Sequence, residues 1–391
     1  MKMINKKTMI VISLIFLFVA NMGLSYAYWA SEILGTQDQN STQLNIGVWT
    51  PPGFIGITED GMGDYITLNQ IGTTGYPLSG KYILMSNIDW NNDSFTPIGG
   101  SSSIFSGEFY GNGYTISNMS ISADQSNVGL FARNSGIIVG VGLINVNINS
   151  SSANDINAGG LVGENLGTIS KSYTTGTLSI TVTKSANTDG LTSNAFGGGL
   201  VGLNSGTISN SHSSVTVLVT TNTNISSGGN RLGYANSYAG GLVGRNTSAA
   251  GLSFTYAEGN VTASSTATAS GNSQGDATSV AGGLVGQSTT STGINRSFAA
   301  GNVTTTTAGK SSNTNNIGPV SAIGATLSSY RRNGQLINSV TNGGTTNGAT
   351  LATQTELRSQ SFLTTNPNPG WIADDWIFDA SFYPRIVQTG Y

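Results

Sequence analysis

Gly159-Gly160-Leu161-Val162-Gly163 is the first of four copies of one pentapeptide, Gly-Gly-Leu-Val-Gly. The other copies are Gly198-Gly199-Leu200-Val201-Gly202, Gly240-Gly241-Leu242-Val243-Gly244 and Gly282-Gly283-Leu284-Val285-Gly286. The second glycines of successive copies lie 39, 42 and 42 residues apart. A repeat period of this length is typical of a solenoid, a propeller or an array of stacked units.

The similarity between copies extends beyond the pentapeptide. The first copy is followed by Asn165-Leu166-Gly167-Thr168-Ile169-Ser170, and the second by Asn204-Ser205-Gly206-Thr207-Ile208-Ser209. Two degenerate copies flank the four, at Val128-Gly129-Leu130-Phe131-Ala132 and at Ser321-Ala322-Ile323-Gly324. Atypical terminal copies are expected in a stack of repeats, because the end units must cap it.

Each repeat holds two short apolar stretches separated by a corner that glycines bound. Leu-Val between glycines can form a brief buried strand, and glycine permits positive φ values and close backbone approach at a corner. Such a unit cannot bury its apolar face alone, so it must stack on a copy of itself. The sequence therefore predicts an all-β fold, a parallel β-solenoid with N- and C-terminal caps. A propeller has a similar period, but the variable polar spacers do not favour four regular strands per blade.

The repeats resemble the GLUG motif of bacterial surface proteins, from about residue 64 to the C-terminus. Residues 82–90, 95–99 and 105–116 are similar to the lead-in that such proteins carry. The resemblance implies an exported, repetitive, adhesin-like β-solenoid. It implies no particular activity, because the motif occurs both alone and beside peptidase domains, and this sequence has no His-Glu-x-x-His to supply zinc-peptidase chemistry.

The composition excludes several classes of function. The chain has 391 residues, one histidine, no cysteine and only 8% charged residues. No basic region is present to bind nucleic acid electrostatically. Without cysteine there is neither a disulfide framework nor a cysteine-ligated metal site. Regularly placed apolar and aromatic residues argue against disorder, so we expect one folded body without a cofactor.

Residues 1–27 have the pattern of a secretory signal. Lys2, Lys6 and Lys7 precede an apolar run at 9–20, and cleavage is predicted between Ala27 and Tyr28. The alternative is an uncleaved membrane anchor. The residues around the junction, with Asn45-Ile46-Gly47-Val48-Trp49, resemble the start of camelysin and TasA-like exported proteins of Firmicutes. That resemblance implies a Gram-positive source and a secreted protein.

The chain order predicts five segments. These are a signal peptide at 1–27, a linker at 28–60, an N-terminal solenoid unit with its cap at 61–149, the GLUG repeat solenoid at 150–345 and a C-terminal cap at 346–391. A short helix is expected near residues 65–71, where it would cover the open end of the solenoid. The polar spacers are either loops on one side or continuations of the alternating strands that precede them. The aromatic tail is expected to pack on the last turn.

No cluster of catalytic residues is evident in the repeats. His212 takes the place that Tyr173 holds in the preceding copy, and no carboxylate lies near it in sequence for acid–base work. Glycosidases need two carboxyl groups at a defined separation, whereas the acids of the repeats are sparse and irregular. They are Asp155, Glu164, Asp189, Glu258 and Asp276. We therefore predict no catalytic residue, no metal site and no enzymatic activity.

The aromatic residues Tyr173, Tyr256 and Phe298 recur at one place in the repeat. They form either a stacked ladder inside the core or an exposed ladder that contacts sugar rings.

The predicted function is an exported adhesin or scaffold of the cell surface or extracellular matrix, which binds a glycan, an extracellular polymer or a host surface through one repetitive face. Contact with a membrane is expected only through the signal segment before cleavage. One alternative is a polysaccharide lyase or glycosidase on the same scaffold. Another is an ice-binding protein, which threonine runs such as residues 304–307 suggest.

Overall fold

The computed structural model describes residues 50–100, 102–226, 229–249, 251–290, 293–323, 329–339, 350–365, 371 and 376–386. The chain divides into two compact units, Met1–Trp49 and Thr50–Tyr391. Every described residue belongs to the second unit. The predicted signal peptide, with its cleavage site at Ala27 and Tyr28, therefore lies outside the described residues.

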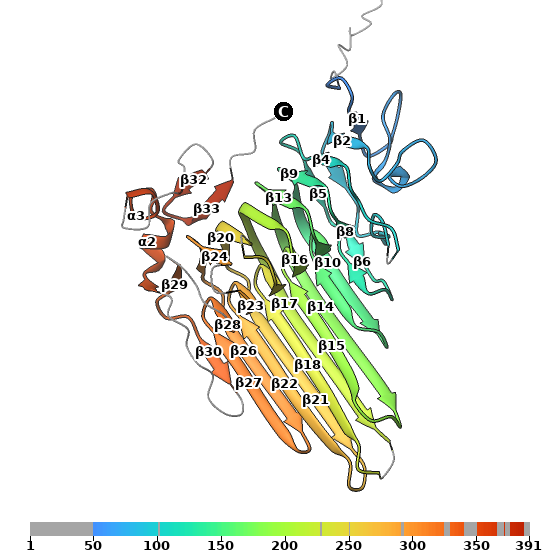
Figure 1. Cartoon of the computed structure of the whole chain (residues 1–391). Coiled ribbons are helices and arrows are strands. Elements are labelled where there is room, and N and C mark those ends of the chain that lie inside the picture. Colours follow the sequence, from blue (N-terminus) through green and yellow to red (C-terminus); the bar gives the residue numbers. More distant parts are fainter. Residues whose placement is uncertain are drawn as a thin grey trace, which may run out of the picture. The chain divides into compact units, whose positions relative to one another are not determined.

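One complete coil shows how the repeat folds. Strand β15 (Leu191–Gly198) leads through Gly199 and Leu200 into β16 (Val201–Asn204), and β17 (Thr207–Ile225) closes the coil. The next coil begins with β18 (Leu232–Gly240), which pairs in parallel and in register with β15. Equivalent strands of successive coils pair in the same way throughout (Figure 1). This arrangement confirms the predicted parallel β-solenoid.

The strands of the described residues form three parallel sheets and one hairpin. The corner sheet contains β8 (Phe131–Asn134), β12 (Val162–Asn165), β16, β19 (Val243–Asn246), β23 (Val285–Ser288) and β28 (Ser321–Ile323). The return sheet contains β7 (Asn127–Val128), β11 (Ile156–Gly159), β15, β18, β22 (Gln274–Gly282) and β27 (Ser312–Gly318).

The large sheet holds the remaining parallel strands and runs along the whole described solenoid. Its members are β1 (Ile55–Ile57), β2 (Lys81–Leu84), β3 (Ile88–Asp89), β4 (Glu108–Tyr110), β5 (Thr115–Ser117), β6 (Ser120–Ile121), β9 (Ile137–Val139), β10 (Gly142–Ser152), β13 (Thr168–Ser170), β14 (Tyr173–Ala186), β17, β20 (Leu252–Ala257), β21 (Val261–Ala269), β24 (Ile294–Asn295), β25 (Phe298–Ala299), β26 (Val303–Gly309), β29 (Tyr330–Arg332), β30 (Ile337–Ser339) and β31 (Thr350–Ala352).

The motif glycines are required by close backbone approach. A Cβ atom on Gly198 would lie 2.1 Å from the carbonyl oxygen of Val201, and one on Gly206 would lie 2.0 Å from that of Gly167 in the preceding coil. Real Cβ contacts are never this short. None of the glycines in the four pentapeptides has positive φ, so the positive-φ role that the sequence suggested for them is wrong, and close approach is the reason for their presence.

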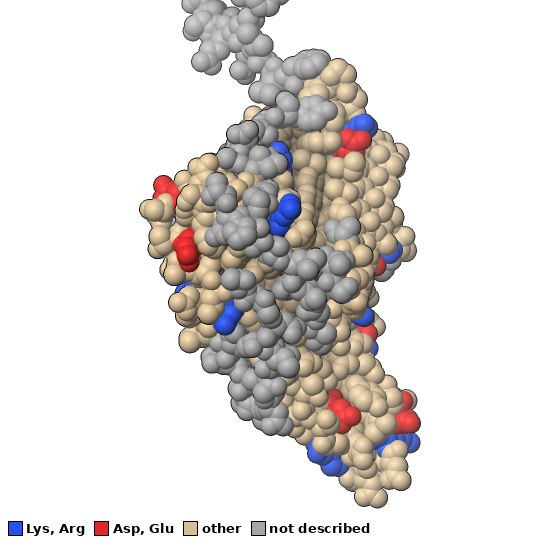
Figure 2. Space-filling model, turned by 60° about the vertical axis from the view of Figure 1, so that its left-hand side comes forward, with Lys and Arg blue, Asp and Glu red and all other residues tan. Residues whose placement is uncertain are grey.

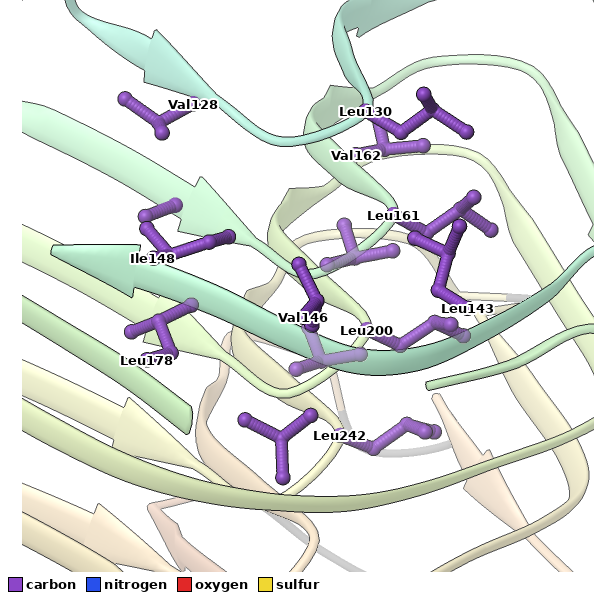
Figure 3. Packing of buried hydrophobic residues seen from close by; sticks show 14 of the residues in the cluster. Val128, Leu130, Leu143, Val146, Ile148, Leu161, Val162, Leu178, Leu200 and Leu242 are labelled. Carbon is purple, nitrogen blue, oxygen red and sulfur yellow. The ribbon is translucent and has the colours of Figure 1, made fainter. Parts of the chain in front are cut away.

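The leucines and valines of the pentapeptides form the centre of the core. Leu130, Leu161, Leu200 and Leu242 follow one another from coil to coil in Figure 3, and each is fully buried. Burial of such a side chain contributes about 1.5–3 kcal/mol. Because each leucine packs on its counterparts above and below, the apolar face of one coil is covered by the next.

A ladder of buried asparagines runs beside this core. Asn134, Asn165, Asn204 and Asn246 have no exposed surface. The Nδ2 atom of each donates to the Oδ1 atom of the next at 2.8 Å, and the ladder ends at Ser288. Each Nδ2 also donates to a carbonyl oxygen two residues further along its own coil, as from Asn204 to Gly206 at 3.2 Å. The buried amides therefore satisfy one another only if the coils stay in register.

The polar spacers form mostly strands. Strand β17 continues through Ile225 and β18 begins at Leu232, so the turn between them is short. Small hydroxyl side chains fill the space between the large and return sheets in this region. Thr221 lies 3.0 Å from the Oγ of Ser237, and Thr223 donates to Ser193 at 2.7 Å. The extension therefore has a polar interior of paired hydroxyl groups.

Both ends of the solenoid carry short additional elements. Strand β1 pairs with β2, so the solenoid begins within the segment 28–60. The helical turn expected near residues 65–71 occurs as the 3-10 helix η1 (Leu68–Gln70). At the other end, α2 (Gln354–Arg358) and α3 (Gln360–Thr365) precede the antiparallel hairpin of β32 (Trp376–Asp379) and β33 (Phe382–Ile386). The helices among the described residues are all too short and too polar to cross a membrane.

The asparagine ladder makes a testable prediction about stability. Asn204→Ala removes a donor and an acceptor, so the Nδ2 atom of Asn165 loses its acceptor in the ladder and the Oδ1 atom of Asn246 loses its donor. We expect the free energy of unfolding to fall by about 2–4 kcal/mol, because each buried unpaired group costs about 1–3 kcal/mol. Chemical denaturation would measure this. The control Asn222→Ala, at an outward-facing position, should change it by no more than about 0.5 kcal/mol; equal losses would contradict the argument.

Candidate functional site

A column of aromatic rings stands on the outer side of the large sheet. Tyr173 and His212 stack with ring centroids 5.1 Å apart, His212 and Tyr256 at 4.6 Å, and Tyr256 and Phe298 at 4.7 Å. Ala257 and Ala299, the next residues along the chain, belong to the solenoid core, whereas Tyr256 and Phe298 belong to a second apolar cluster. The rings therefore point away from the solenoid interior.

A left-handed residue precedes each ring by two positions. These residues are Lys171, Asn210, Phe254 and Arg296, with φ between 45° and 53°. Left-handed backbone conformation is uncommon outside glycine. It recurs at one place in successive coils, between two strands at Lys171 and Arg296 and within β17 and β20 at Asn210 and Phe254. The local change of backbone direction sets the direction of the ring that follows.

The C-terminal segment covers this aromatic ladder. The ring of Trp376 lies 5.9 Å from that of Tyr256, and the ring of Tyr383 lies 5.6 Å from that of Phe298. The Tyr256 hydroxyl donates to the backbone carbonyl oxygen of Pro384 at 2.5 Å. The ladder is thus neither inside the solenoid core nor an exposed sugar-binding surface, the two arrangements that the sequence suggested. The tail packs along the side of several coils as well as at the end.

A cavity of about 440 Å³ lies near the N-terminal end, and its lining contains no ionisable side chain. A second cavity, of about 340 Å³, lies between the ladder and the hairpin. We call the second one the ladder cavity. Its lining residues are Ile144, Tyr173, Thr175, His212, Ser214, Tyr256, Glu258, Ile377, Phe382, Tyr383, Arg385 and Ile386. It combines a floor of aromatic edges with hydroxyl groups and with one side chain of each charge.

The register of the strands brings the polar lining together. Tyr173 pairs with His212 and Thr175 with Ser214, and Tyr256 follows in the next coil. Side chains two positions apart on a strand face the same side of the sheet. Ser214, two residues after His212, and Glu258, two residues after Tyr256, therefore lie beside the aromatic ladder. The Ser214 hydroxyl donates to the carboxylate of Glu258. Glu258 was noted in the sequence, but its proximity to His212 depends on the stacking of coils.

His212 is held in its neutral form. Burial, and then the positive charge of Arg385, lower the pKa of its imidazole from 6.5 to about 3. Its Nδ1 atom is buried and has no hydrogen-bond partner among the described residues. Burial also raises the pKa of the Tyr256 hydroxyl well above 10. At neutral pH the ladder cavity therefore presents an uncharged imidazole, and the side chains of Glu258 and Arg385 also line it.

The other acidic residues do not converge on this cavity. Asp155 pairs with Lys184 at 2.6 Å and Glu164 with Arg133 at 2.6 Å. Within the described ranges, no three histidine, aspartate or glutamate side chains are placed to share a metal ion. Figure 2 shows charged side chains as small separate patches on the visible face.

A mainly polar surface covers the long strands of the large sheet. Its central row consists of Ser151, Thr181, Thr220, Ser264 and Thr306, which pair from strand to strand. The row on one side is Asn149, Ser179, Leu218, Thr262 and Thr304, and the row on the other is Thr183, Asn222, Thr266 and Ala308. We call these three rows the polar face. The side chains repeat at the spacing of parallel strands, about 4.8 Å.

Comparison with known protein-family models gives no match, and comparison with curated proteins gives none. Among solved structures, one described as a putative immunoglobulin A1 protease from Bacteroides ovatus is similar, with a TM-score of 0.52 and 19% sequence identity. The match covers 86% of this chain and 92% of that chain. At this identity the likeness shows a shared solenoid fold.

The prediction that this chain is not an enzyme is contradicted by that match, because the similar structure bears the name of a protease. The prediction rested on the lack of a catalytic cluster within the repeats. A site that combines repeat residues with the C-terminal segment, as the ladder cavity does, produces no such cluster in the sequence.

The buried imidazole predicts a pH-dependent stability. Between pH 3 and 6.5 the unfolded chain binds a proton that folded His212 does not, so the free energy of unfolding falls as the pH falls through this window. The expected loss between pH 6.5 and 5 is about 1.6 kcal/mol, because the slope rises from about 0.7 kcal/mol per pH unit at pH 6.5 to about 1.4 kcal/mol per pH unit at pH 5. His212→Phe keeps an aromatic ring in the ladder and should remove this slope. Denaturant titrations at pH 5 to 7 would test it, and an unchanged slope in the variant would show that another group is responsible.

Proposed function

We propose that this chain is an exported β-solenoid of the cell surface or extracellular matrix, and that it acts as an adhesin or scaffold by binding a glycan or another extended hydroxylated polymer along the polar face. The observation that carries the proposal is the in-register repetition of hydroxyl and amide side chains over five successive strands. The signal-like N-terminus and the resemblance to GLUG proteins support the exported location.

The chemistry of the polar face favours a long neutral ligand. Ser, Thr and Asn side chains both donate and accept hydrogen bonds, as the hydroxyl groups of a polysaccharide do. No lysine, arginine, aspartate or glutamate lies in the three rows, so attraction to a charged polymer has no source there. Each contact with solvent-exposed groups is weak, but a ligand that repeats along several coils would engage many of them at once.

Two variants with equal charge changes test the polar face. The double substitution Thr220→Glu with Ser264→Glu places two carboxylates on adjacent strands of the central row. We expect at least about a ten-fold loss of affinity for the polymer, equivalent to about 1.4 kcal/mol. The matched control is Asn236→Glu with Thr278→Glu, a pair on adjacent strands of the return sheet. Residues 28–391 would be screened against glycans, matrix polymers and immunoglobulin A1, and binding measured for each positive.

The outcomes separate the possible functions. Loss of binding in the polar-face variant alone supports the proposal, and equal behaviour of both variants contradicts it. Every ligand would also be examined for cleavage, because the similar solved structure is named for proteolysis of immunoglobulin A1. New reducing ends, unsaturated sugars or peptide fragments would replace the adhesin proposal with an enzymatic one. Failure of every ligand to bind would also contradict it and favour a structural role in self-assembly.

A further inference from the structure

We propose that the ladder cavity binds a sugar acid, a hydroxylated ring that carries a carboxylate, with Arg385 holding the carboxylate and with Ser214 and Glu258 holding ring hydroxyls. This site is separate from the polar face and involves none of its residues. It does not depend on the proposed polymer binding, because it is formed by other residues of the coils together with strand β33.

Arg385 is the positively charged side chain of the ladder cavity, and it would bind an anionic group of the ligand. Its guanidinium carbon lies 4.2 Å from the centroid of the Phe382 ring, and its side chain makes no hydrogen bond or ion pair with any described residue. A guanidinium stacked on a ring keeps the N–H groups of its edge available, and these match a carboxylate in a bidentate arrangement. Arg385 and His212 both line the ladder cavity, and the positive charge of Arg385 contributes to the lowered pKa of His212.

The polar residues that the coils contribute to the cavity suit hydroxyl groups. The Ser214 hydroxyl donates to Glu258, so its lone pairs remain as acceptors, and the carboxylate of Glu258 has further lone pairs for ligand hydroxyl donors. Thr175, paired with Ser214 across the strands, adds another hydroxyl. A lining that combines these acceptors with one guanidinium fits a ligand that carries both hydroxyl donors and a carboxylate.

The floor also favours polar recognition over ring stacking. The planes of Tyr173 and His212 differ by 4°, and those of His212 and Tyr256 by 6°. Both faces of His212 are therefore covered, and the ring can contribute only its edge to a ligand. Nδ1 of His212 is a buried polar atom without a partner among the described residues. Such orphaned groups are rare unless water or a ligand satisfies them.

The size of the cavity limits the ligand. A volume of about 340 Å³ lies near the lower end of the range for small-molecule pockets, about 300–1,000 Å³. Aliphatic side chains of Ile144, Ile377 and Ile386 complete its lining. A monosaccharide or the terminal residue of a chain is therefore expected, and an internal stretch of polymer is not.

The single histidine provides a specific probe. His212 is the only histidine of the chain, so its imidazole resonance in residues 28–391 can be assigned without ambiguity. We expect glucuronate at neutral pH to shift this resonance saturably, with a Kd of about 1 mM, typical of a small weak ligand. Glucose, which lacks the carboxylate, should bind at least about ten-fold more weakly.

Substitutions then locate the carboxylate. Arg385→Gln should weaken glucuronate binding at least about ten-fold, and Arg385→Lys should weaken it less, because the charge remains while the bidentate geometry is lost. Arg231→Gln, at the far end of the long strands, is the matched control and should leave the affinity unchanged. The polar-face double variant should also bind glucuronate normally, which separates this proposal from the polymer site.

Three results would overturn the proposal. The first is no saturable shift with glucuronate in a protein whose spectrum shows it to be folded. The second is equal binding of glucose and glucuronate. The third is normal glucuronate binding by a folded Arg385→Gln variant.

Discussion

The constraint on which the structure depends is that each coil must lie on the preceding one at the spacing of a parallel β-sheet. Backbone hydrogen bonds alone would tolerate a slip between coils, but two features of the interior do not. Gly206 has room for no side chain, because a Cβ atom would lie 2.0 Å from the carbonyl oxygen of Gly167. The amide of Asn204 is satisfied by those of Asn165 and Asn246 only when all three are in line. A one-residue slip would orphan buried amides and force backbone contacts at once.

The same register produces the outer surfaces. Once coils are in line, a residue type repeated in sequence becomes a continuous column, whether or not its side chain points inward. The leucines form the core in this way, the rings from Tyr173 to Phe298 form the aromatic ladder, and the row that includes Thr220 forms the polar face. An outward column of rings would expose a large apolar strip, and such strips promote association. The C-terminal segment covers it, so Trp376 and Tyr383 give the ladder a second apolar core.

The sequence predicted the solenoid because a 39–42-residue period is visible without any knowledge of contacts. It also showed Asn165 and Asn204 at equivalent places, each two residues before a glycine. The buried amide ladder was missed, since asparagine shortly before glycine usually indicates a turn. The ladder cavity could not be predicted from the sequence, for a different reason. His212 and Glu258 lie on adjacent coils, whereas Arg385 lies several coils further along the chain. No local sequence pattern predicts that the C-terminal segment folds back along the coils. The left-handed backbone conformation at Lys171 and Asn210 could not be predicted from a repeated residue type, because the two side chains differ.

The affinities of the two candidate binding surfaces would depend on different features of the structure. The polar face is an extension of the repeat itself, so its affinity would grow with the number of coils that a ligand spans, and any one side chain would matter little. The ladder cavity exists once, because the hairpin of β32 and β33 meets the coils at one place, and its selectivity would depend on a few side chains such as Arg385 and Glu258. Additional repeats in the sequence would enlarge the polar face by adding coils, whereas the ladder cavity can change only by substitution of its residues. A protein with both could hold a polymer along its coils and recognise a particular acidic group at one end of the ladder.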